Sequence, residues 1–184
     1  MPVGKADSKR RIPTDHKKEV CPGCGLVLPV VDGGRHPYIG ASASCWALFT
    51  EVLAREYGNP AYLAIHRTTV DAYAAQHPGL PEPRSITSVN VHLVGLYLVL
   101  ERRLEPGFVG AVIGDLTKQK ADLRWLPPPA TLGSVTVIEV SRQDASIRDH
   151  EDAVRAWARS VWAAWAPHRE TIVVLAEDAV RSRG

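Results

Sequence analysis

Cys21 and Cys24 carry the spacing in this sequence that most clearly points to chemistry. They stand in the run Cys-Pro-Gly-Cys-Gly, and two residues between thiolates let both sulfurs face one ion. Pro22 fixes a backbone angle, and the glycines permit the tight turn that directs backbone amides towards the sulfurs. This run is typical of a zinc knuckle. A dithiol redox pair shares the spacing but normally begins a helix in a βαβ unit, which the pattern here lacks, and unreactive surface thiols are the third alternative.

A structural zinc site needs four ligands, and the knuckle supplies two. Cys45 is the only other cysteine, so no second Cys-x-x-Cys exists and the remaining ligands must be distant in the chain. The alternative for Cys45 is a small buried core residue. The candidate histidines are His36, His66, His77, His92, His150 and His168.

The elements that must position these ligands are two helices, expected at Ser42–Tyr57 and Pro60–Gln76. Ser42 or Ser44 can cap the first helix, and Gly58 can end it in a left-handed conformation. Asn59-Pro60 suits the cap and first position of the second helix. So short a connection predicts an antiparallel hairpin, which returns the end of the second helix to the start of the first. We therefore predict that Zn²⁺ is held by Cys21, Cys24, Cys45 and His77. A histidine before Pro-Gly can also simply cap helix carbonyls, and this alternative stays open.

A second histidine group stands outside this set. His92 lies in the most apolar helix of the sequence, expected from Ser85 or Thr87 to Arg103, and a buried imidazole needs hydrogen-bond partners. Asp71 or Tyr73 on the preceding helix could supply one. A satisfied core histidine is the plain interpretation. If His66 and His150 also met His92, three imidazoles would leave a metal with an open coordination position, which a hydrolytic or transferase site requires.

The rest of the sequence predicts a mainly α fold. Trp157, Trp162 and Trp165 lie on one stripe of a helix from Ile147 to Ala166, where tryptophans most often serve packing. A shorter helix is expected at Phe108–Lys118 and a last one at His168–Arg181. Ser134–Val140 is either one strand or a short helix begun by Thr136, and the periodicity does not decide between them.

Composition bounds the organisation and the partners. The chain has 184 residues and a net charge of +2, which fits one ordinary domain without a global field for nucleic acid or lipid. Residues 1–20 are basic and aperiodic, so we expect a flexible tail there, through which alone nucleic acid could be bound, and a single zinc-binding helical domain at 21–184. No apolar run is long enough for a signal peptide or membrane span, which predicts a cytoplasmic protein with reduced thiols.

Several segments together resemble a bacterial family of unknown function. They are the Cys-Pro-Gly-Cys-Gly run, Ala43–Trp46, His66–Gly79, Ser88–Leu93 and Trp157–Trp165, and the likeness covers about residues 20–168. Its members look like small cytoplasmic proteins. The resemblance implies that Cys21, Cys24, Cys45, His66, Asp71, His77 and His92 form a functional set, and it names no activity.

The sequence therefore predicts a zinc-stapled helical bundle with an N-terminal knuckle and at most one or two short strands. We expect a binding or adaptor module with a structural zinc and an unknown protein or small-molecule partner. The alternative is a metal-dependent hydrolase or transferase that uses His66, His92 and Asp71. No nucleophile elbow, phosphate-binding glycine loop or dinucleotide fingerprint is present, so whether the chain is an enzyme stays undecided.

Overall fold

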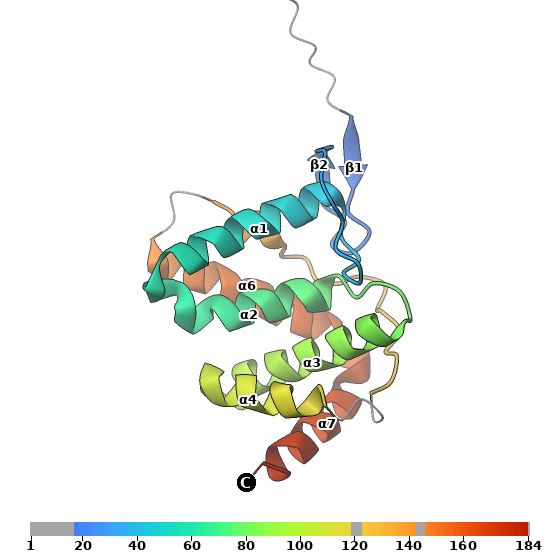
Figure 1. Cartoon of the computed structure of the whole chain (residues 1–184), viewed down its shortest axis with the longest axis vertical. Coiled ribbons are helices and arrows are strands. Elements are labelled where there is room, and N and C mark those ends of the chain that lie inside the picture. Colours follow the sequence, from blue (N-terminus) through green and yellow to red (C-terminus); the bar gives the residue numbers. More distant parts are fainter. Residues whose placement is uncertain (1–16, 119–122, 143–145, 184) are drawn as a thin grey trace, which may run out of the picture.

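Two antiparallel helices joined by a very short connection organise the N-terminal half of the molecule (Figure 1). The computed structural model describes residues 17–118, 123–142 and 146–183. In chain order its elements are β1 (Lys18–Val20), β2 (Val27–Pro29), α1 (Ala43–Gly58), the 3₁₀ turn η1 (Pro60–Tyr62), α2 (Leu63–Gln76), α3 (Pro83–Leu100), α4 (Pro106–Leu116), α5 (Val137–Val140), α6 (Ile147–Ala164), the 3₁₀ turn η3 (Ala166–His168) and α7 (Arg169–Arg181).

The caps of the first helical hairpin follow from the sequence, with one exception. Ser42 caps α1 by accepting a hydrogen bond from the amide of Cys45, and Asn59 caps η1 by accepting from that of Ala61. Gly58 is still helical and is not among the glycines with positive φ, so the expectation of a left-handed stop there was wrong. The chain instead leaves α1 through an extended Asn59, because this residue must already cap the next turn.

Two other boundaries differ from the expectation or resolve it. α3 begins at Pro83, before Ser85, because proline fits the first turn of a helix. Thr136 and Glu139 form a capping box that opens the short helix α5, so the segment Ser134–Val140 contains a helix and no strand. A second capping box, between Ser146 and Asp149, starts α6.

The core lies on both sides of α2 and α3. α2 packs against α3 and α6, and α3 packs further against α4 and α7. Trp157 and Trp165 of the α6 stripe are fully buried, which confirms their packing role. Their indole N–H groups donate to the side chain of Gln76 and the carbonyl of Ala75, so α6 is also hydrogen-bonded to the end of α2.

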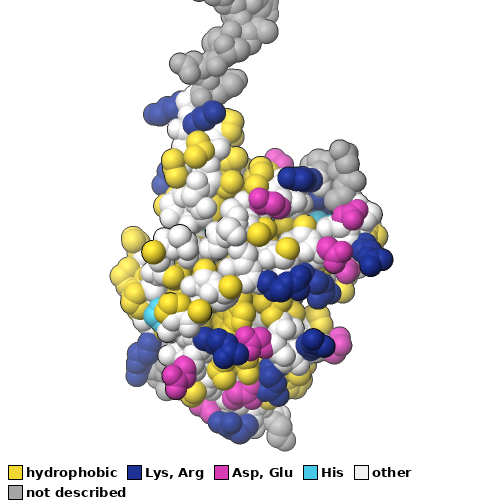
Figure 2. Space-filling model, turned by 180° about the vertical axis from the view of Figure 1, so that it is seen from behind, with side chains coloured by type: hydrophobic (Ala, Val, Ile, Leu, Met, Phe, Trp, Pro, Cys, Tyr) yellow, Lys and Arg dark blue, Asp and Glu magenta, His cyan; other side chains and the backbone are white. Residues whose placement is uncertain are grey.

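The strands β1 and β2 form a small antiparallel ribbon that projects from the helices (Figure 1). Glu19 pairs with Leu28 and Val20 with Val27. The segment expected as a flexible tail includes Lys18–Val20, which pair with β2, and Lys17, whose carbonyl accepts from the amide of Val30. Residues 1–16 of that segment lie outside the described residues. Seen from behind, the ribbon carries exposed hydrophobic side chains, with basic residues towards its outer end (Figure 2).

The predicted class, mainly helical with at most two short strands, is confirmed. None of the described helices combines the length and apolar character needed to cross a membrane.

Candidate metal centre

The Cys-Pro-Gly-Cys-Gly run is the turn that joins β1 to β2. The amide of Cys21 donates to the carbonyl of Leu26 at 2.8 Å, and that of Gly25 donates back to the carbonyl of Cys21 at 3.0 Å. Gly25 adopts a φ of +76°, a left-handed conformation that glycine tolerates best. These constraints close the loop so that Cys21 and Cys24 lie on the side that faces the helices.

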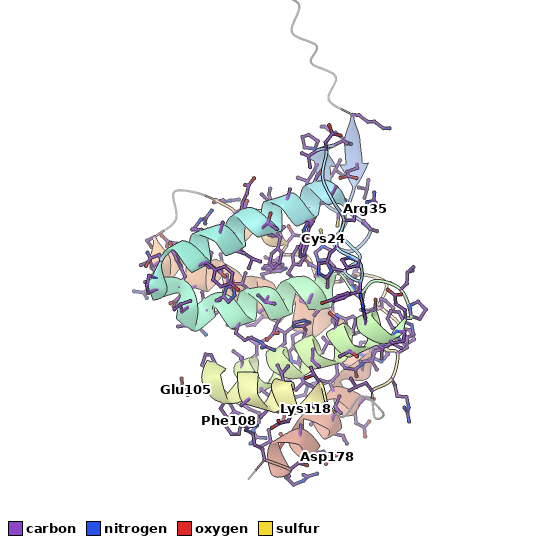
Figure 3. The ribbon with its side chains drawn as sticks, in the orientation of Figure 1. Cys24, Arg35, Glu105, Phe108, Lys118 and Asp178 are labelled. Carbon is purple, nitrogen blue, oxygen red and sulfur yellow. The ribbon has the colours of Figure 1, made fainter. Side chains whose placement is uncertain are left out.

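Gly23 allows the knuckle to touch the end of α2. A Cβ atom at this position would lie 2.4 Å from Cδ2 of His77 and 2.7 Å from the carbonyl oxygen of Gln76, closer than packed atoms approach. Only glycine therefore lets the turn lie directly against the His77 ring. Cys24, labelled in Figure 3, lies where the ribbon meets the adjoining ends of α1 and α2.

Four donor atoms converge at this junction. One ligand atom each from Cys21, Cys24, Cys45 and His77 lies within 4.8 Å of all the others. Cys24 and Cys45 are 3.7 Å apart between sulfurs, and the Cys45 sulfur is 3.5 Å from Nε2 of His77. The structure thus brings together the four residues that the sequence singled out. In the described part of the chain they are the one group of three or more Cys, His, Asp or Glu residues spaced to hold an ion.

These separations match a tetrahedral zinc site. With Zn–S bonds of about 2.3 Å and a Zn–N bond of about 2.0–2.1 Å, the sulfur–sulfur edge is about 3.8 Å and the sulfur–nitrogen edge is about 3.5 Å. The two measured separations agree with these edges. The donor set, three thiols and one imidazole, is also one that structural zinc uses.

The surroundings of the four groups hold them in a ligating orientation. Nδ1 of His77 lies 2.7 Å from the carbonyl oxygen of Tyr73, which can only accept, so Nδ1 carries the proton and Nε2 presents its lone pair to the sulfurs. The Tyr73 hydroxyl donates to the Cys45 sulfur at 3.7 Å. Cys21, Cys45 and His77 are almost completely buried, whereas Cys24 is partly exposed.

Crowding of three thiols makes their ionisation unequal in the absence of a cation. Hydrogen bonds from Cys24 and Cys45 lower the pKa of Cys21. The same contact with Cys21, together with burial, raises the pKa of Cys24 to about 12, and contacts with both partners raise that of Cys45. One thiolate is therefore stable without a cation, and a bound divalent ion is what would stabilise all three.

The ribbon is also hydrogen-bonded to the start of α1. The Glu19 carboxylate accepts from the amide and hydroxyl of Ser44 at 3.0 and 2.7 Å, and the amide of Val31 donates to the Ser44 hydroxyl. The bond from the Ser44 amide is the largest cause that lowers the pKa of Glu19. An acidic group at a helix N-terminus is electrostatically favourable, so this contact orients the knuckle towards Cys45.

Comparison with known proteins gives one match. The model of DUF5946, a family of unknown function, matches residues 19–166, which is most of the chain and includes all four converging residues. The chain belongs to DUF5946. The resemblance to a family of unknown function is thereby confirmed, while the bacterial origin stays a prediction. No curated protein and no solved structure matches this DUF5946 chain.

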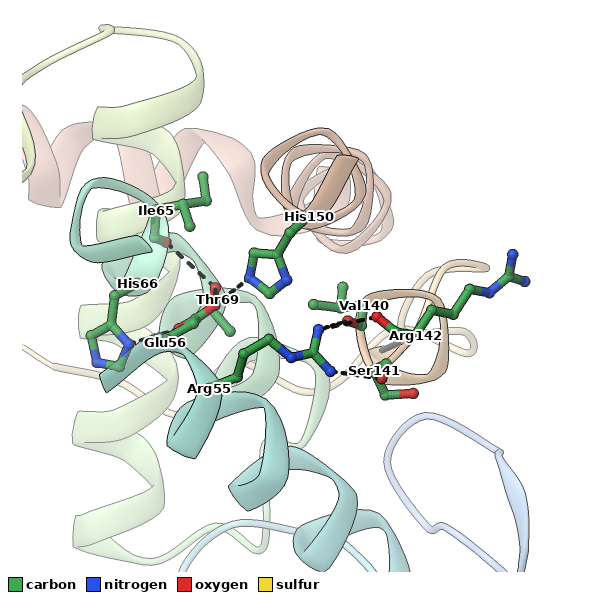
Figure 4. Close-up of polar contacts among 9 residues, drawn as sticks. All are labelled: Arg55, Glu56, Ile65, His66, Thr69, Val140, Ser141, Arg142 and His150. Carbon is green, nitrogen blue, oxygen red and sulfur yellow. Dashed lines mark hydrogen bonds and ion pairs between the residues drawn. The ribbon is translucent and has the colours of Figure 1, made fainter. Parts of the chain in front are cut away.

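His66 and His150 lie together in this DUF5946 member, but on a carboxylate that the sequence did not single out (Figure 4). Glu56 is fully buried and contacts Nδ1 of His66 at 2.7 Å and Nε2 of His150 at 2.8 Å. It also accepts from the Thr69 hydroxyl at 2.6 Å. Glu56 lies on the core stripe of α1, where a carboxylate surrounded by three donors is satisfied although buried.

His92 lies with the other predicted residue, Asp71, and not with His66. Its Nδ1 is 2.7 Å from Asp71, which also accepts from Nε of Arg67. The alternative site of His66, His92 and Asp71 is therefore distributed over two carboxylates, Glu56 and Asp71. Sequence reasoning missed Arg67, although its position four residues before Asp71 on one helix is a detectable signal; no comparable signal marks Glu56.

Proposed function

We propose that this protein is a binding or adaptor module whose fold is held by a structural zinc at Cys21, Cys24, Cys45 and His77. The observation that carries the proposal is the spacing of the four donor atoms, which fits a tetrahedral ion. Four protein ligands saturate such an ion and leave no position for water or substrate. The zinc would supply cross-linking and no reaction chemistry.

The position of the site supports a stabilising role. Cys21 and Cys24 belong to the ribbon, Cys45 to α1, and His77 to the end of α2. One ion would therefore fasten the ribbon, whose two strands are only three residues long, to both helices of the hairpin. Burial of most of the donor set shields the ion from solvent and from ligand exchange.

The alternative functions find less support. A catalytic metal at His66, His92 and Asp71 needs these groups at one place, and His66 contacts a different carboxylate. A redox pair at Cys21 and Cys24 leaves the third thiol and the imidazole beside it without a role. The binding partner and the cytoplasmic location stay predictions, and a nucleic-acid role through the basic tail rests mainly on residues outside those described.

Metal analysis of the reduced protein tests the structural role. We expect one zinc per chain in the wild type, and loss of both the zinc and the cooperative thermal unfolding transition at its original temperature in Cys21→Ser. A chelator should lower the melting temperature of the wild type in the same way. A zinc-free wild type that unfolds at the same temperature with and without chelator would overturn the proposal.

A further inference from the structure

Asp71 and His92 form a carboxylate–imidazole pair that includes none of the proposed zinc ligands. Asp71 has no exposed surface, and both of its oxygens lie 3.0 Å from Nε of Arg67. α3 makes room for this carboxylate with Gly95, where a Cβ atom would lie 2.2 Å from Oδ2 of Asp71. A charge that is fully buried, paired and pressed against a helix backbone holds its imidazole partner in one orientation.

The contact with Asp71 engages one ring nitrogen of His92 and leaves the other, Nε2, without a hydrogen bond to a described residue. The Asp71 carboxylate, which is ion-paired with the Arg67 guanidinium, accepts a hydrogen bond from Nδ1 of His92. Nε2 is the ring nitrogen that stays available to a ligand. The His92 side chain is 19% exposed, so a ligand can approach. The carboxylate–imidazole pair thus resembles a positioned binding group more than a core histidine with both nitrogens satisfied.

His92 lies between two adjoining hollows that share Tyr38, Ser88 and His92 as walls. The outer hollow, about 500 Å³, is a groove along the start of α3, bordered by Arg84 and Thr87. The inner hollow, about 130 Å³, is lined mainly by apolar and aromatic side chains, which include Trp46, Phe49 and Tyr73. A mostly apolar hollow with a few convergent polar groups is the usual form of a small-molecule site.

Two buried polar atoms at the chamber have no hydrogen-bond partner among the described residues. They are Oγ of Ser88 and Nδ1 of His36. Ser88 itself is 94% buried, since its relative exposure is 6%. Buried polar groups are nearly always hydrogen-bonded, and an unpaired one in a cavity wall marks a place where a ligand supplies the partner.

The wall that carries His36 and Tyr38 is fixed in place. The Ser85 hydroxyl donates to the carbonyl of Tyr38 at 3.1 Å, and the amide of Gly40 donates to the carbonyl of His77 at 3.0 Å. This wall of the chamber is therefore an anchored segment and not a free loop.

The charge of the walls specifies the ligand. One guanidinium, that of Arg84, and two imidazoles line the hollows, whereas none of their described lining residues is acidic. Arg84 is exposed, takes part in no ion pair among the described residues, and lies in the first turn of α3, where the helix dipole also favours an anion. An anionic head in the groove would thus be favoured by Arg84 and by the imidazolium form of His92, in which both ring nitrogens donate.

The size of the chamber specifies the rest of the ligand. Cavities of about 150 Å³ lined by apolar side chains take up benzene in other proteins, so a volume of about 130 Å³ suits a single ring. We propose that the pocket of Tyr38, Ser88 and His92 binds a small aromatic carboxylate. Its ring lies in the chamber, and its carboxylate faces Arg84, the Ser88 hydroxyl and the imidazolium form of His92, which donates from Nε2 as well as from Nδ1. This inference deepens the proposed binding role by naming the class of partner, and none of the residues that line the two hollows is a zinc ligand.

Titration of the full-length, zinc-loaded protein with benzoate, followed by ligand-observed NMR and calorimetry, tests this proposal. Benzoate should bind saturably, and Arg84→Gln and His92→Gln should each weaken it about tenfold, the effect of one lost charge-assisted hydrogen bond. Arg155→Gln, an exposed position on α6, is the matched control and should bind as the wild type does. Benzyl alcohol, which keeps the ring and lacks the charge, should bind about tenfold more weakly than benzoate.

The outcomes separate this proposal from that of the zinc site. Absence of saturable benzoate binding to wild type that carries one zinc per chain would overturn the ligand assignment and leave the zinc proposal intact. Equal affinity in Arg84→Gln, His92→Gln and Arg155→Gln would likewise overturn it, because binding would then lie elsewhere. Equal affinity for benzoate and benzyl alcohol would overturn the anionic specificity. Zinc content and the melting temperature, measured on each variant, show that it is folded.

Discussion

Cys45 and His77, which are 32 positions apart in the sequence, lie 3.5 Å apart between Sγ and Nε2 at the open end of the α1–α2 hairpin. Their proximity follows from the length of the two helices and the short turn between them, which return the end of α2 to the start of α1. The knuckle completes the group from the ribbon side. The zinc account depends on this contact, because without it the knuckle offers only two ligands.

Replacement of His77 should remove the metal. His77→Ala takes away one of four ligands, and we expect zinc affinity to fall by more than about a hundredfold, beyond the usual effect of losing a residue that only supports a ligand. His168→Ala is the control, since that imidazole is not among the four converging residues and makes a hydrogen bond to the carbonyl of Pro127 and a ring contact with Trp165. Competition with a chromophoric chelator measures both. Equal affinities in the two variants would remove His77 from the site.

Gly23→Ala should separate the knuckle from α2. The added methyl group would overlap the His77 ring and the Gln76 carbonyl, so the turn must shift and the fourth ligand moves away. We expect weaker zinc binding and a loss of roughly 1–3 kcal/mol of stability. Gly33→Ala has open space around its Cβ and is the matched control. Chemical denaturation with and without chelator checks the prediction; identical curves for both variants would contradict it.

Gly95→Ala should disturb the Asp71–His92 pair. Its methyl group would overlap the Asp71 carboxylate inside a close-packed core, at a cost of roughly 1–3 kcal/mol in stability. Gly110→Ala, in α4, meets no neighbour and should stabilise the helix by up to about 1 kcal/mol. Urea denaturation gives both values. The prediction fails if the two substitutions shift the midpoint in the same direction.

Glu56→Gln should destabilise the junction of α1, α2 and α6. The buried carboxylate now accepts hydrogen bonds from His66, Thr69 and His150. The amide nitrogen of glutamine cannot accept, so one of these three donors would lose its acceptor. We expect a loss of roughly 2–4 kcal/mol. Glu51→Gln, exposed on the same helix, should change stability by less than about 0.5 kcal/mol. A wild-type melting curve for Glu56→Gln would show that the network is not satisfied as described.

Zinc uptake should release protons and strengthen with pH. In the metal-free protein the pKa of Cys24 and Cys45 is raised, so these thiols are protonated at neutral pH, whereas the lowered pKa of Cys21 favours its thiolate. Binding of zinc as three thiolates must then displace about two protons per ion, and affinity must rise as pH rises. Calorimetry in buffers of different ionisation enthalpy counts these protons. A count of zero would contradict the thiol ionisation states inferred here.

The sequence was sufficient to predict the hairpin and the convergence of Cys45 and His77 because both depend on local chemistry. Cap residues, a short connection and helix length fix where Cys45 and His77 lie. The network around Glu56 could not be found in this way, because it joins α1, α2 and α6 through contacts such as that with His150, 94 positions away. The chamber beside His92 likewise exists only once the 36–40 segment lies against α3. The prediction that Gly58 ends α1 in a left-handed conformation was wrong for a local reason. Asn59 caps the next turn, and the sequence alone did not show that this role would prevail.

X-ray absorption at the zinc edge of the purified, reduced protein tests the central claim most directly. The account predicts one zinc per chain with three sulfur neighbours at about 2.3 Å and one nitrogen at about 2.0–2.1 Å, and no further oxygen ligand. In Cys45→Ser the three-sulfur signal should disappear. A wild-type spectrum with two sulfurs, or with a water oxygen in the coordination sphere, would contradict a saturated structural site. It would favour a metal with an open coordination position instead.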